Sequence, residues 1–323
     1  MSTGNYKDQA LTQFFMRKPA RFKLDEIEES KLPDEEMLLA FAVFKSTLNE
    51  IVGAVQAFYN MAMAGAIDAR FNRILMANRL RAMAKFTGTD KEKDDEEINR
   101  EALKQTHAEW SLDGLDEELL QQVAHNLMHL SDNVPDLIAE SNNAILRQSS
   151  VMLWGATENL LREYFRVSVN RKPVLSKHLF ESEEAKRFWN VRDLTIDVIQ
   201  GAGFDLGKCM GDVLIEINPM INLKSIKAAY AVICGNSENL KRLLKDKATY
   251  DLFALRNLVA HRNGLVDAKF LSETSFTIEL NEKVIINPAL FEKLYMAAKD
   301  IGVELFQYTK LKFSGADPQK VRP

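Results

Sequence analysis

The stretch LKRLLKDKATYDLFALRNLVAHRNG, residues 240–264, indicates the fold class most directly. Its apolar residues recur at spacings of three and four, which is the period of one face of an α-helix. They are Leu240, Leu244, Ala248, Leu252, Leu255 and Val259. The pattern predicts a single helix of about 25 residues, about 37 Å long at the usual rise per residue. Asn263 and Gly264 suit a left-handed cap at the end of this helix.

Helical periodicity recurs along most of the chain, so the sequence predicts a mainly α-helical bundle. Residues 275–287 instead alternate between apolar and polar side chains, which predicts one small β-hairpin. Residues 201–219 are rich in helix breakers and predict a loop. We expect helices at residues 34–86, as one or two long helices, and at residues 111–130, 136–169, 182–200 and 288–313.

The chain divides into three parts by sequence pattern. Residues 1–135 form an N-terminal helical region whose role the sequence does not indicate, and the mixed-charge run at residues 89–97 is a solvated linker or helix start within it. Residues 136–313 form a C-terminal helical domain. Residues 314–323 offer no apolar anchor, so we expect a disordered tail there.

The composition excludes binding to nucleic acid through overall charge. The chain has 323 residues, of which 46% are hydrophobic and 27% are charged, as in ordinary globular proteins that bury a sizeable core. Its formal net charge is -4, so no chain-wide positive field is available to neutralise phosphates. Any contact with nucleic acid therefore needs a local basic patch.

The sequence favours a reducing, cytoplasmic location without a membrane. Cys209 and Cys234 are the only cysteines and form no disulfide framework, and the N-terminus lacks the layout of a secretory signal. The most apolar stretch, Ile51–Ile67, contains Gln56 and Asn60 and falls short of the roughly 20 apolar residues that a membrane span requires. We expect it to form a buried helix.

Three polar residues precede the predicted helix end and form the main candidate site. On a regular helix Asn257 and His261 lie on one face, turned away from the apolar stripe, with Arg256 on the flank of that face. This placement disfavours a core histidine. A solvent-exposed helix end, where cationic side chains complement the helix dipole, remains the structural alternative.

The charge of the same stretch favours an anionic ligand. Four of its basic residues are candidates for binding RNA phosphates, and they outnumber the nearby acids Asp246 and Asp251. A histidine can move protons in RNA cleavage at neutral pH, and an arginine can stabilise the charged phosphate, without a metal or cofactor. The four candidates are Lys241, Arg242, Lys245 and Lys247.

Residues 255–270, LRNLVAHRNGLVDAKF, resemble the signature of the HEPN superfamily of small helical domains. Its active members carry an arginine, a polar residue that is often asparagine, three variable residues and a histidine near a helix end. Arg256, Asn257 and His261 match this pattern. The segments at residues 154–165 and 289–306 resemble the early and closing core helices of one prokaryotic branch. The resemblance covers roughly residues 140–313. The residues that often follow the signature in that branch are matched by Asn263, Gly264, Val266 and Asp267.

The resemblance implies a metal-independent endoribonuclease that acts as a homodimer, in which two such sets share one cleft and leave a cyclic phosphate and a 5′-hydroxyl. Arg256 would hold the scissile phosphate, His261 would transfer protons, and Asn257 would orient the histidine or bind phosphate. Arg262 departs from the family pattern, which often has a small or amide residue after the histidine. Such proteins are frequent among toxins and antiphage defence systems.

Other assignments remain open at this stage. Some relatives are inactive, so the domain could instead serve dimerisation, nucleotide binding or partner binding, with the N-terminal helices contacting an antitoxin or another protein. Glu158 is a secondary candidate for the site, and an ion pair with Arg162 is the alternative for it. His125 and His129 stand four apart and could face a metal in a helical enzyme, but a polar helix face explains them as well.

One further motif is a near miss. Gly201, Gly203 and Gly207 approach the dinucleotide-binding pattern of glycines, but the third glycine comes one residue late and no βαβ unit is visible. We interpret these glycines as loop residues.

Overall fold

The computed structural model describes residues 22–28, 34–85, 91–110 and 135–313, together with a few single positions. These positions are residues 32, 119, 122, 123, 125, 126, 129 and 133. The described residues are mainly α-helical and include no β-strand, which confirms the predicted fold class. The tail predicted to be disordered, residues 314–323, lies outside them.

The chain forms two compact units whose division differs from the predicted one. Unit 1 comprises Met1–Arg17 and Gln56–Asn142, and unit 2 comprises Lys18–Val55 and Asn143–Pro323. The predicted division assigned all of residues 1–135 to one region. Helix α2 (Glu35–Val55) belongs instead to unit 2, because its apolar face packs there against the C-terminal helix.

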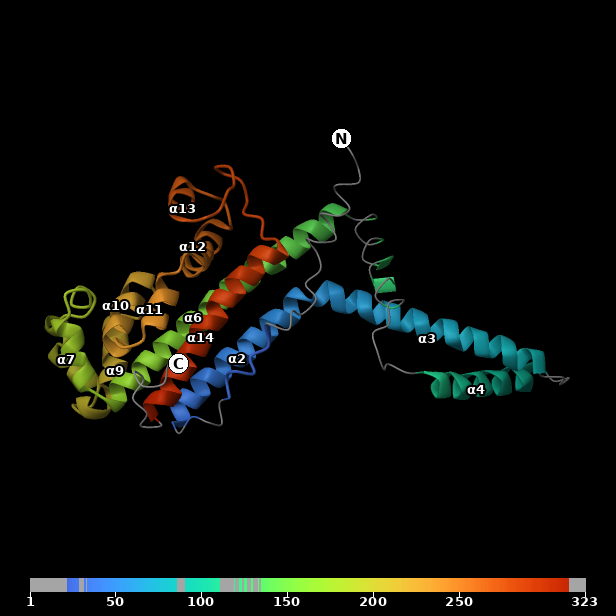
Figure 1. The fold of residues 1–323 in the computed structure, drawn as a ribbon, viewed down its shortest axis with the longest axis horizontal. Helices are drawn as coiled ribbons and strands as arrows, with labels where there is room; N and C mark the ends of the chain where they lie inside the picture. The colour runs from blue at the N-terminus through green and yellow to red at the C-terminus, as the bar shows by residue number, and fades with distance from the viewer. Residues whose placement is uncertain are drawn as a thin grey trace. The chain divides into compact units, whose positions relative to one another are not determined.

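Unit 1 contains a pair of helices, α3 (Ala57–Lys85) and α4 (Lys91–Glu109), which pack side by side (Figure 1). The amide of Asn78 on α3 donates to the hydroxyl of Thr106 on α4 over 3.3 Å, and both residues are fully buried. Of the helix predicted at residues 111–130, Leu119 and Val123 are helical and buried against α3, whereas Leu127 and Leu130 lie outside the described residues.

Unit 2 is built on three long helices, which are α2, the part of α6 (Pro135–Arg171) from Asn143 onward, and α14 (Pro288–Phe313) (Figure 1). Phe41 of α2 meets the ring of Phe306 of α14 edge to face, with centroids 5.4 Å apart. The shorter helices pack against this framework. They are α7 (Val174–Glu181), α8 (Ile196–Gly201), α9 (Leu206–Ile217), α10 (Leu223–Ile233), α11 (Glu238–Lys245), α12 (Lys247–Arg262) and α13 (Ala268–Glu273), with one 3-10 turn, η3 (Val191–Asp193).

Helix α2 is long and apolar enough to cross a membrane by length and composition, and it is the one described helix that is. In the structure one apolar face of α2 packs within unit 2, whereas Leu39 and Val43 are exposed. Phe41, Phe44, Leu48 and Ile51 are each almost completely buried. The stretch that the sequence analysis considered, Ile51–Ile67, is divided between α2 and α3 at Gln56.

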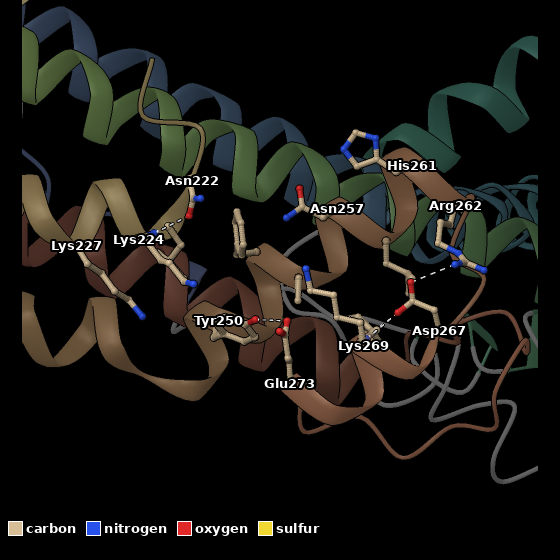
Figure 2. A pocket seen from close by; sticks show the side chains of 15 residues that line it. Asn222, Lys224, Lys227, Tyr250, Asn257, His261, Arg262, Asp267, Lys269 and Glu273 are labelled. Carbon is tan, nitrogen blue, oxygen red and sulfur yellow. Dashed lines mark hydrogen bonds and ion pairs between the residues drawn. The ribbon is translucent and has the colours of Figure 1, made fainter. Parts of the chain in front are cut away.

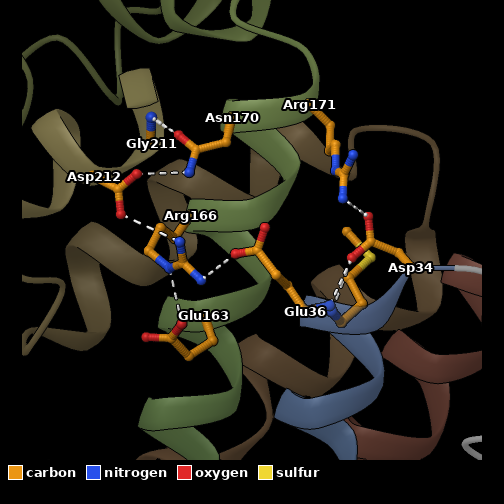
Figure 3. Close-up of polar contacts among 9 residues, drawn as sticks. Asp34, Glu36, Glu163, Arg166, Asn170, Arg171, Gly211 and Asp212 are labelled. Carbon is orange, nitrogen blue, oxygen red and sulfur yellow. Dashed lines mark hydrogen bonds and ion pairs between the residues drawn. The ribbon is translucent and has the colours of Figure 1, made fainter. Parts of the chain in front are cut away.

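A cluster of charged residues holds α2, α6 and α9 together (Figure 3). The guanidinium of Arg166 on α6 donates to Glu36 on α2 over 2.7 Å, to Glu163 over 2.9 Å and to Asp212 on α9 over 3.2 Å. Beside it, the backbone N–H of Gly211 donates to the side-chain oxygen of Asn170 over 2.6 Å. We refer to these six residues, namely Glu36, Glu163, Arg166, Asn170, Gly211 and Asp212, as the Arg166 cluster.

The single helix predicted over residues 240–264 is wrong in one respect, because the structure breaks it into α11 and α12 at Asp246. Asp246 has an extended ψ of 145°, and its carboxylate accepts a hydrogen bond from the N–H of Ala248 over 2.8 Å. An aspartate in this role starts a new helix. The apolar stripe continues across the break because Leu244 and Ala248 both remain buried against the core.

Two other predicted boundaries are wrong. Residues 182–200 are mostly turns, with only η3 and the start of α8 helical, because Asn190 and Thr195 each cap a new short element. Residues 201–219, predicted as a loop, contain α9, whose Gly211 lies on the face that approaches α6. The helices predicted at residues 34–86 and 288–313 are confirmed as α2, α3 and α14.

The predicted β-hairpin at residues 275–287 does not form. Residues 281–284 pair instead with the chain just after α12. The N–H of Val266 donates to the carbonyl of Glu282 over 2.9 Å, and the N–H of Val284 donates to that of Gly264 over 2.8 Å. Leu265 and Lys283 form an isolated antiparallel bridge. The alternating pattern thus reflects an extended segment that has the end of α12 as its partner.

Candidate functional site

Helix α12 ends as its sequence predicts. Asn263 has left-handed backbone angles, φ 51° and ψ 31°, and the N–H of Gly264 donates to the carbonyl of Leu258 over 3.2 Å. This is the cap that Asn-Gly favours after a helix. It fixes His261 and Arg262 in the last turn, where both side chains are exposed.

A pocket of about 460 Å³ opens along α12 and is closed by the start of α10 and by α13 (Figure 2). This volume is within the range of pockets that bind small molecules and nucleotides. Fifteen residues line it. The polar ones are Asn222, Lys224, Lys227, Tyr250, Asn257, His261, Arg262, Asp267, Lys269 and Glu273.

The pocket brings together two of the three residues of the predicted site. Asn257 and His261 both line it, with Asn257 half-buried and His261 exposed. Arg256 does not line the pocket. It is half-buried on the flank of α12, and its guanidinium donates to the side-chain oxygen of Asn257 over 2.9 Å. The side chain of Asn257 therefore connects Arg256 to the pocket that His261 lines.

Arg262 also lines the pocket but has a carboxylate partner. It lies 3.2 Å from Asp267, which is also the N-cap of α13 and accepts from the N–H of Phe270 over 2.7 Å. The ion pair joins the end of α12 to the start of α13. Arg262 therefore has a structural role, because its ion pair keeps α13 in place as one wall of the pocket.

Three lysines of the pocket were not among the predicted site residues. Lys224 and Lys227 come from α10 and Lys269 comes from α13, and none of them forms an ion pair with a carboxylate among the described residues. No direct signal in the sequence indicates them, because α10 lies some 30 residues before His261 and only the fold brings it alongside α12. The lone local sign was Asn222, whose side chain caps α10 by accepting from the N–H of Lys224 over 2.9 Å.

Two aromatic side chains, Tyr250 and Phe253, also line the pocket. The hydroxyl of Tyr250 donates to Glu273 over 2.6 Å, and burial together with this carboxylate raises the pKa of Tyr250 to about 12. Phe253 packs edge to face on the buried Trp154 of α6, with centroids 5.2 Å apart. Both rings are held in place by neighbours, so the part of the pocket that they line is formed before any ligand binds.

The basic residues predicted to bind RNA lie in a second, more open pocket. It is lined by Lys241, Arg242, Lys245 and Lys247, with Glu238 and Asp246. The sequence placed these lysines on the helix that carries His261. The break at Asp246 instead puts them around the α11–α12 junction.

Lys247 joins the second pocket to the first. The ammonium of Lys247 lies 5.6 Å from the ring centroid of Tyr250 and donates to the backbone carbonyl of Glu273. Burial lowers the pKa of Lys227, and the positive charge of Lys245 lowers it further.

Glu158 occupies a buried position outside the pocket. It accepts a hydrogen bond from the indole N–H of Trp154 over 2.8 Å and lies 4.0 Å from the guanidinium of Arg162. The alternative considered for it, an ion pair one helical turn away, is present. Its link to the pocket is indirect, through Trp154 and Phe253.

The remaining candidates have ordinary surroundings. His129 lies beside Asn133, whose amide nitrogen is 3.1 Å from the imidazole, and the described residues contain no group of three or more His, Cys, Asp or Glu able to hold a metal. Gly201 ends α8, Gly203 has a left-handed φ of 63° in the turn that follows, and Gly207 lies in α9. The loop interpretation therefore holds for Gly203 and is wrong for Gly201 and Gly207, which are helical.

No protein-family model, curated protein or solved structure matches the chain.

Proposed function

We propose that this protein is a metal-independent endoribonuclease of the HEPN type, with Arg256, Asn257 and His261 as its catalytic residues. The observation that carries the proposal is the position of His261. It is an exposed imidazole on the rim of a basic pocket, next to an asparagine that already binds an arginine. An anionic substrate is favoured because Lys224, Lys227 and Lys269 bring positive charge to a chain of net charge -4.

The proposed reaction is a transfer of the phosphodiester within the RNA. A base removes the proton of a 2′-hydroxyl, whose oxygen attacks the adjacent phosphorus. The bond from phosphorus to the 5′-oxygen breaks, and an acid protonates that oxygen. The products are a 2′,3′-cyclic phosphate and a 5′-hydroxyl. Arg256 would stabilise the additional negative charge on the phosphate during this transfer.

The number of histidines favours a shared site. The reaction moves one proton to a base and another from an acid, whereas His261 is the single histidine among the residues that line the pocket. A second copy of the chain would supply the second imidazole. Because His261 and Asn257 lie away from the buried face of α12, they are free to meet that copy. We propose a homodimer that acts in the cytoplasm, as a toxin or in antiphage defence.

Cleavage of RNA by matched variants tests the catalytic proposal. Purified protein is incubated with total RNA in EDTA, beside His261→Ala and Arg256→Ala. Each variant should lose at least about 100-fold in cleavage rate, the usual contribution of an acid–base group or a charge stabiliser. His178→Ala and Arg192→Ala remove the same side chains at exposed positions outside the pocket and should cleave normally. Cleavage that persists in His261→Ala would falsify the proposal.

Sedimentation tests the shared site separately. The protein should sediment as a dimer at micromolar concentration. A strictly monomeric species would remove the second imidazole and with it the proposed acid and base pair.

A nucleotide-binding module without catalysis is the second candidate. One observation favours it, because Arg256 does not line the pocket, whereas two aromatic side chains and three lysines do. If the protein binds a mononucleotide tightly and cuts no RNA, this function replaces the first. The N-terminal helices would then serve a protein partner, which co-purification would detect.

A further inference from the structure

The lysines on α10 and α13 are placed to bind anionic groups in addition to the phosphate that the proposed catalytic residues would hold. The two carboxylates of the first pocket already have partners, since Asp267 binds Arg262 and the N–H of Phe270, and Glu273 binds Tyr250. Lys224, Lys227 and Lys269 form no ion pair among the described residues. Their charges are therefore available to a ligand.

Lys227 is the key member of this set because it is half-buried, whereas Lys224 and Lys269 are exposed. It is half-buried in the first pocket and interacts with Lys245, which lines the second. Two like charges held close together in a partly buried setting repel each other. A phosphate between them would replace this repulsion with two attractive contacts.

The two pockets also share a wall on the other side of the α11–α12 junction. Lys247 lines the second pocket, yet it contacts Tyr250 and Glu273, which line the first. The basic surface thus continues from the exposed face of α11 to the last turn of α12. Within α12 alone, between Lys247 and His261, it spans about 21 Å at the usual helical rise. This is longer than one nucleotide can cover.

We propose that Lys224, Lys227 and Lys269 form a phosphate-binding subsite beside His261, and that Lys245 connects it to Lys241 and Arg242, so that one single-stranded RNA occupies both pockets. The inference rests on the proposed function for the choice of RNA as the anion. The exposed second pocket receives the strand, and the inner subsite holds the phosphates next to the one that is cleaved. The rings of Tyr250 and Phe253 provide surfaces on which bases can stack.

Binding measurements in a cleavage-deficient background test this arrangement. The His261→Ala protein is titrated into a fluorescein-labelled, mixed-sequence 12-nucleotide RNA, and anisotropy gives the Kd at several salt concentrations. Adding Lys227→Ala should weaken binding about tenfold and adding Lys245→Ala about fivefold. Each lost phosphate contact should reduce the slope of log K against log salt concentration by about 0.7.

Matched variants control for charge and for folding. Lys208→Ala removes the same charge from an exposed position on α9 that lines neither pocket, and it should leave the Kd within about twofold. Lys227→Arg keeps the charge and should retain most of the affinity. If Lys227→Ala binds like Lys208→Ala, or if AMP displaces the 12-nucleotide RNA as completely as unlabelled RNA does, the subsite proposal is overturned.

The outcomes separate this proposal from the catalytic one. RNA cleavage that depends on His261 but not on Lys227 or Lys245 would leave the ribonuclease standing and remove the subsite. Binding that depends on Lys227, in a protein that cuts no RNA, would support the subsite and remove the ribonuclease.

Discussion

Arg166 and Lys227 are both partly buried cations at helix junctions of unit 2, but their surroundings differ. Arg166 meets three carboxylates within 3.2 Å, from α2, α6 and α9 (Figure 3). Burial opposes its charge, but the hydrogen bonds to Glu163 and Glu36 outweigh this and raise the pKa of Arg166 well above its usual range. Lys227 has no carboxylate partner among the described residues, and the pKa of its ammonium is lowered.

The difference separates a charge that stabilises the fold from one that the fold leaves available. Breaking the contacts of a paired, partly buried cation leaves its partners uncompensated, so the free energy of unfolding should fall. Removing an unpaired, partly buried cation should raise the free energy of unfolding. It should otherwise weaken only the binding of the ligand that the cation contacts. The following substitutions test this contrast, from the largest expected effect to the smallest.

Gly211→Ala should have the largest effect on stability. A Cβ atom at this position would lie 2.1 Å from the backbone carbonyl oxygen of Arg166 and 2.8 Å from the side-chain oxygen of Asn170. Because the closest atom is backbone, α9 would have to move away from α6, which would disrupt the Arg166 cluster. We expect a loss of about 3 kcal/mol, measured by urea unfolding.

Gly155→Ala is the matched control for this substitution. Gly155 lies within α6, and a Cβ atom there would meet nothing within 4 Å. Alanine favours a helix over glycine by roughly 1 kcal/mol, so this variant should be slightly more stable. If both variants unfold at the same urea concentration, the close packing of α9 on α6 is not what supports the cluster.

Arg166→Met should have the next largest effect. Methionine keeps much of the apolar stem but leaves Glu36, Glu163 and Asp212 close together without a cation. We expect a loss of about 2 kcal/mol, less than for a completely buried pair because the carboxylates are partly exposed. Arg192→Met on η3 should change stability by less than about 0.5 kcal/mol. RNA binding by folded Arg166→Met should be normal. A larger Kd for RNA would mean that Arg166, like Lys227, contributes to RNA binding.

The sequence predicted the local features of the fold better than the contrast between these two cations. The α12 cap at Asn263 and the long helices α2, α3 and α14 follow from residues that are neighbours in the chain. The break at Asp246 was missed because the apolar stripe continues through it. An aspartate can either end one helix and cap the next or lie exposed within a single helix, and periodicity does not distinguish the two.

The candidate site was predictable only in part for the same reason. Asn257 and His261 lie four residues apart, so helical geometry alone places them on one face. Lys224, Lys227 and Lys269 reach the same pocket through the packing of α10 and α13 around α12, which no spacing in the sequence encodes. The carboxylates that make Arg166 a structural residue are likewise spread over three helices.

Lys227→Gln should have the opposite sign to Arg166→Met. Because the pKa of Lys227 is lowered in the folded state, the folded protein binds this proton less tightly than the unfolded chain does. Its charge therefore costs stability at neutral pH, and the cost disappears as pH rises above the usual lysine range. At pH 7 we expect the Tm of Lys227→Gln to rise by about 1–2 °C, measured by calorimetry, while RNA binding weakens. A lower Tm would mean that Lys227 has a stabilising partner.

Tyr250→Phe should have the smallest effect, and it appears only at high pH. Burial and the hydrogen bond to Glu273 raise the pKa of Tyr250 from 10.0 in the unfolded chain to about 12. A raised pKa contributes stability that is complete below the unfolded value and is lost as pH rises through the folded value. Between pH 10 and 12 the wild-type protein should therefore lose the stabilisation that the Tyr250 hydroxyl provides. Tyr250→Phe lacks this stabilisation at every pH. Because the side chain is only partly buried, this loss should not exceed about 1 kcal/mol. The difference in Tm between the two proteins should thus narrow from pH 9 to pH 11.5, whereas the buried Tyr164, Tyr230 and Tyr295, present in both, cancel in the comparison. A difference in Tm that stays constant over this range would show that the Tyr250 hydroxyl does not donate a hydrogen bond to Glu273. The wall between the two pockets would then depend on Lys247 alone.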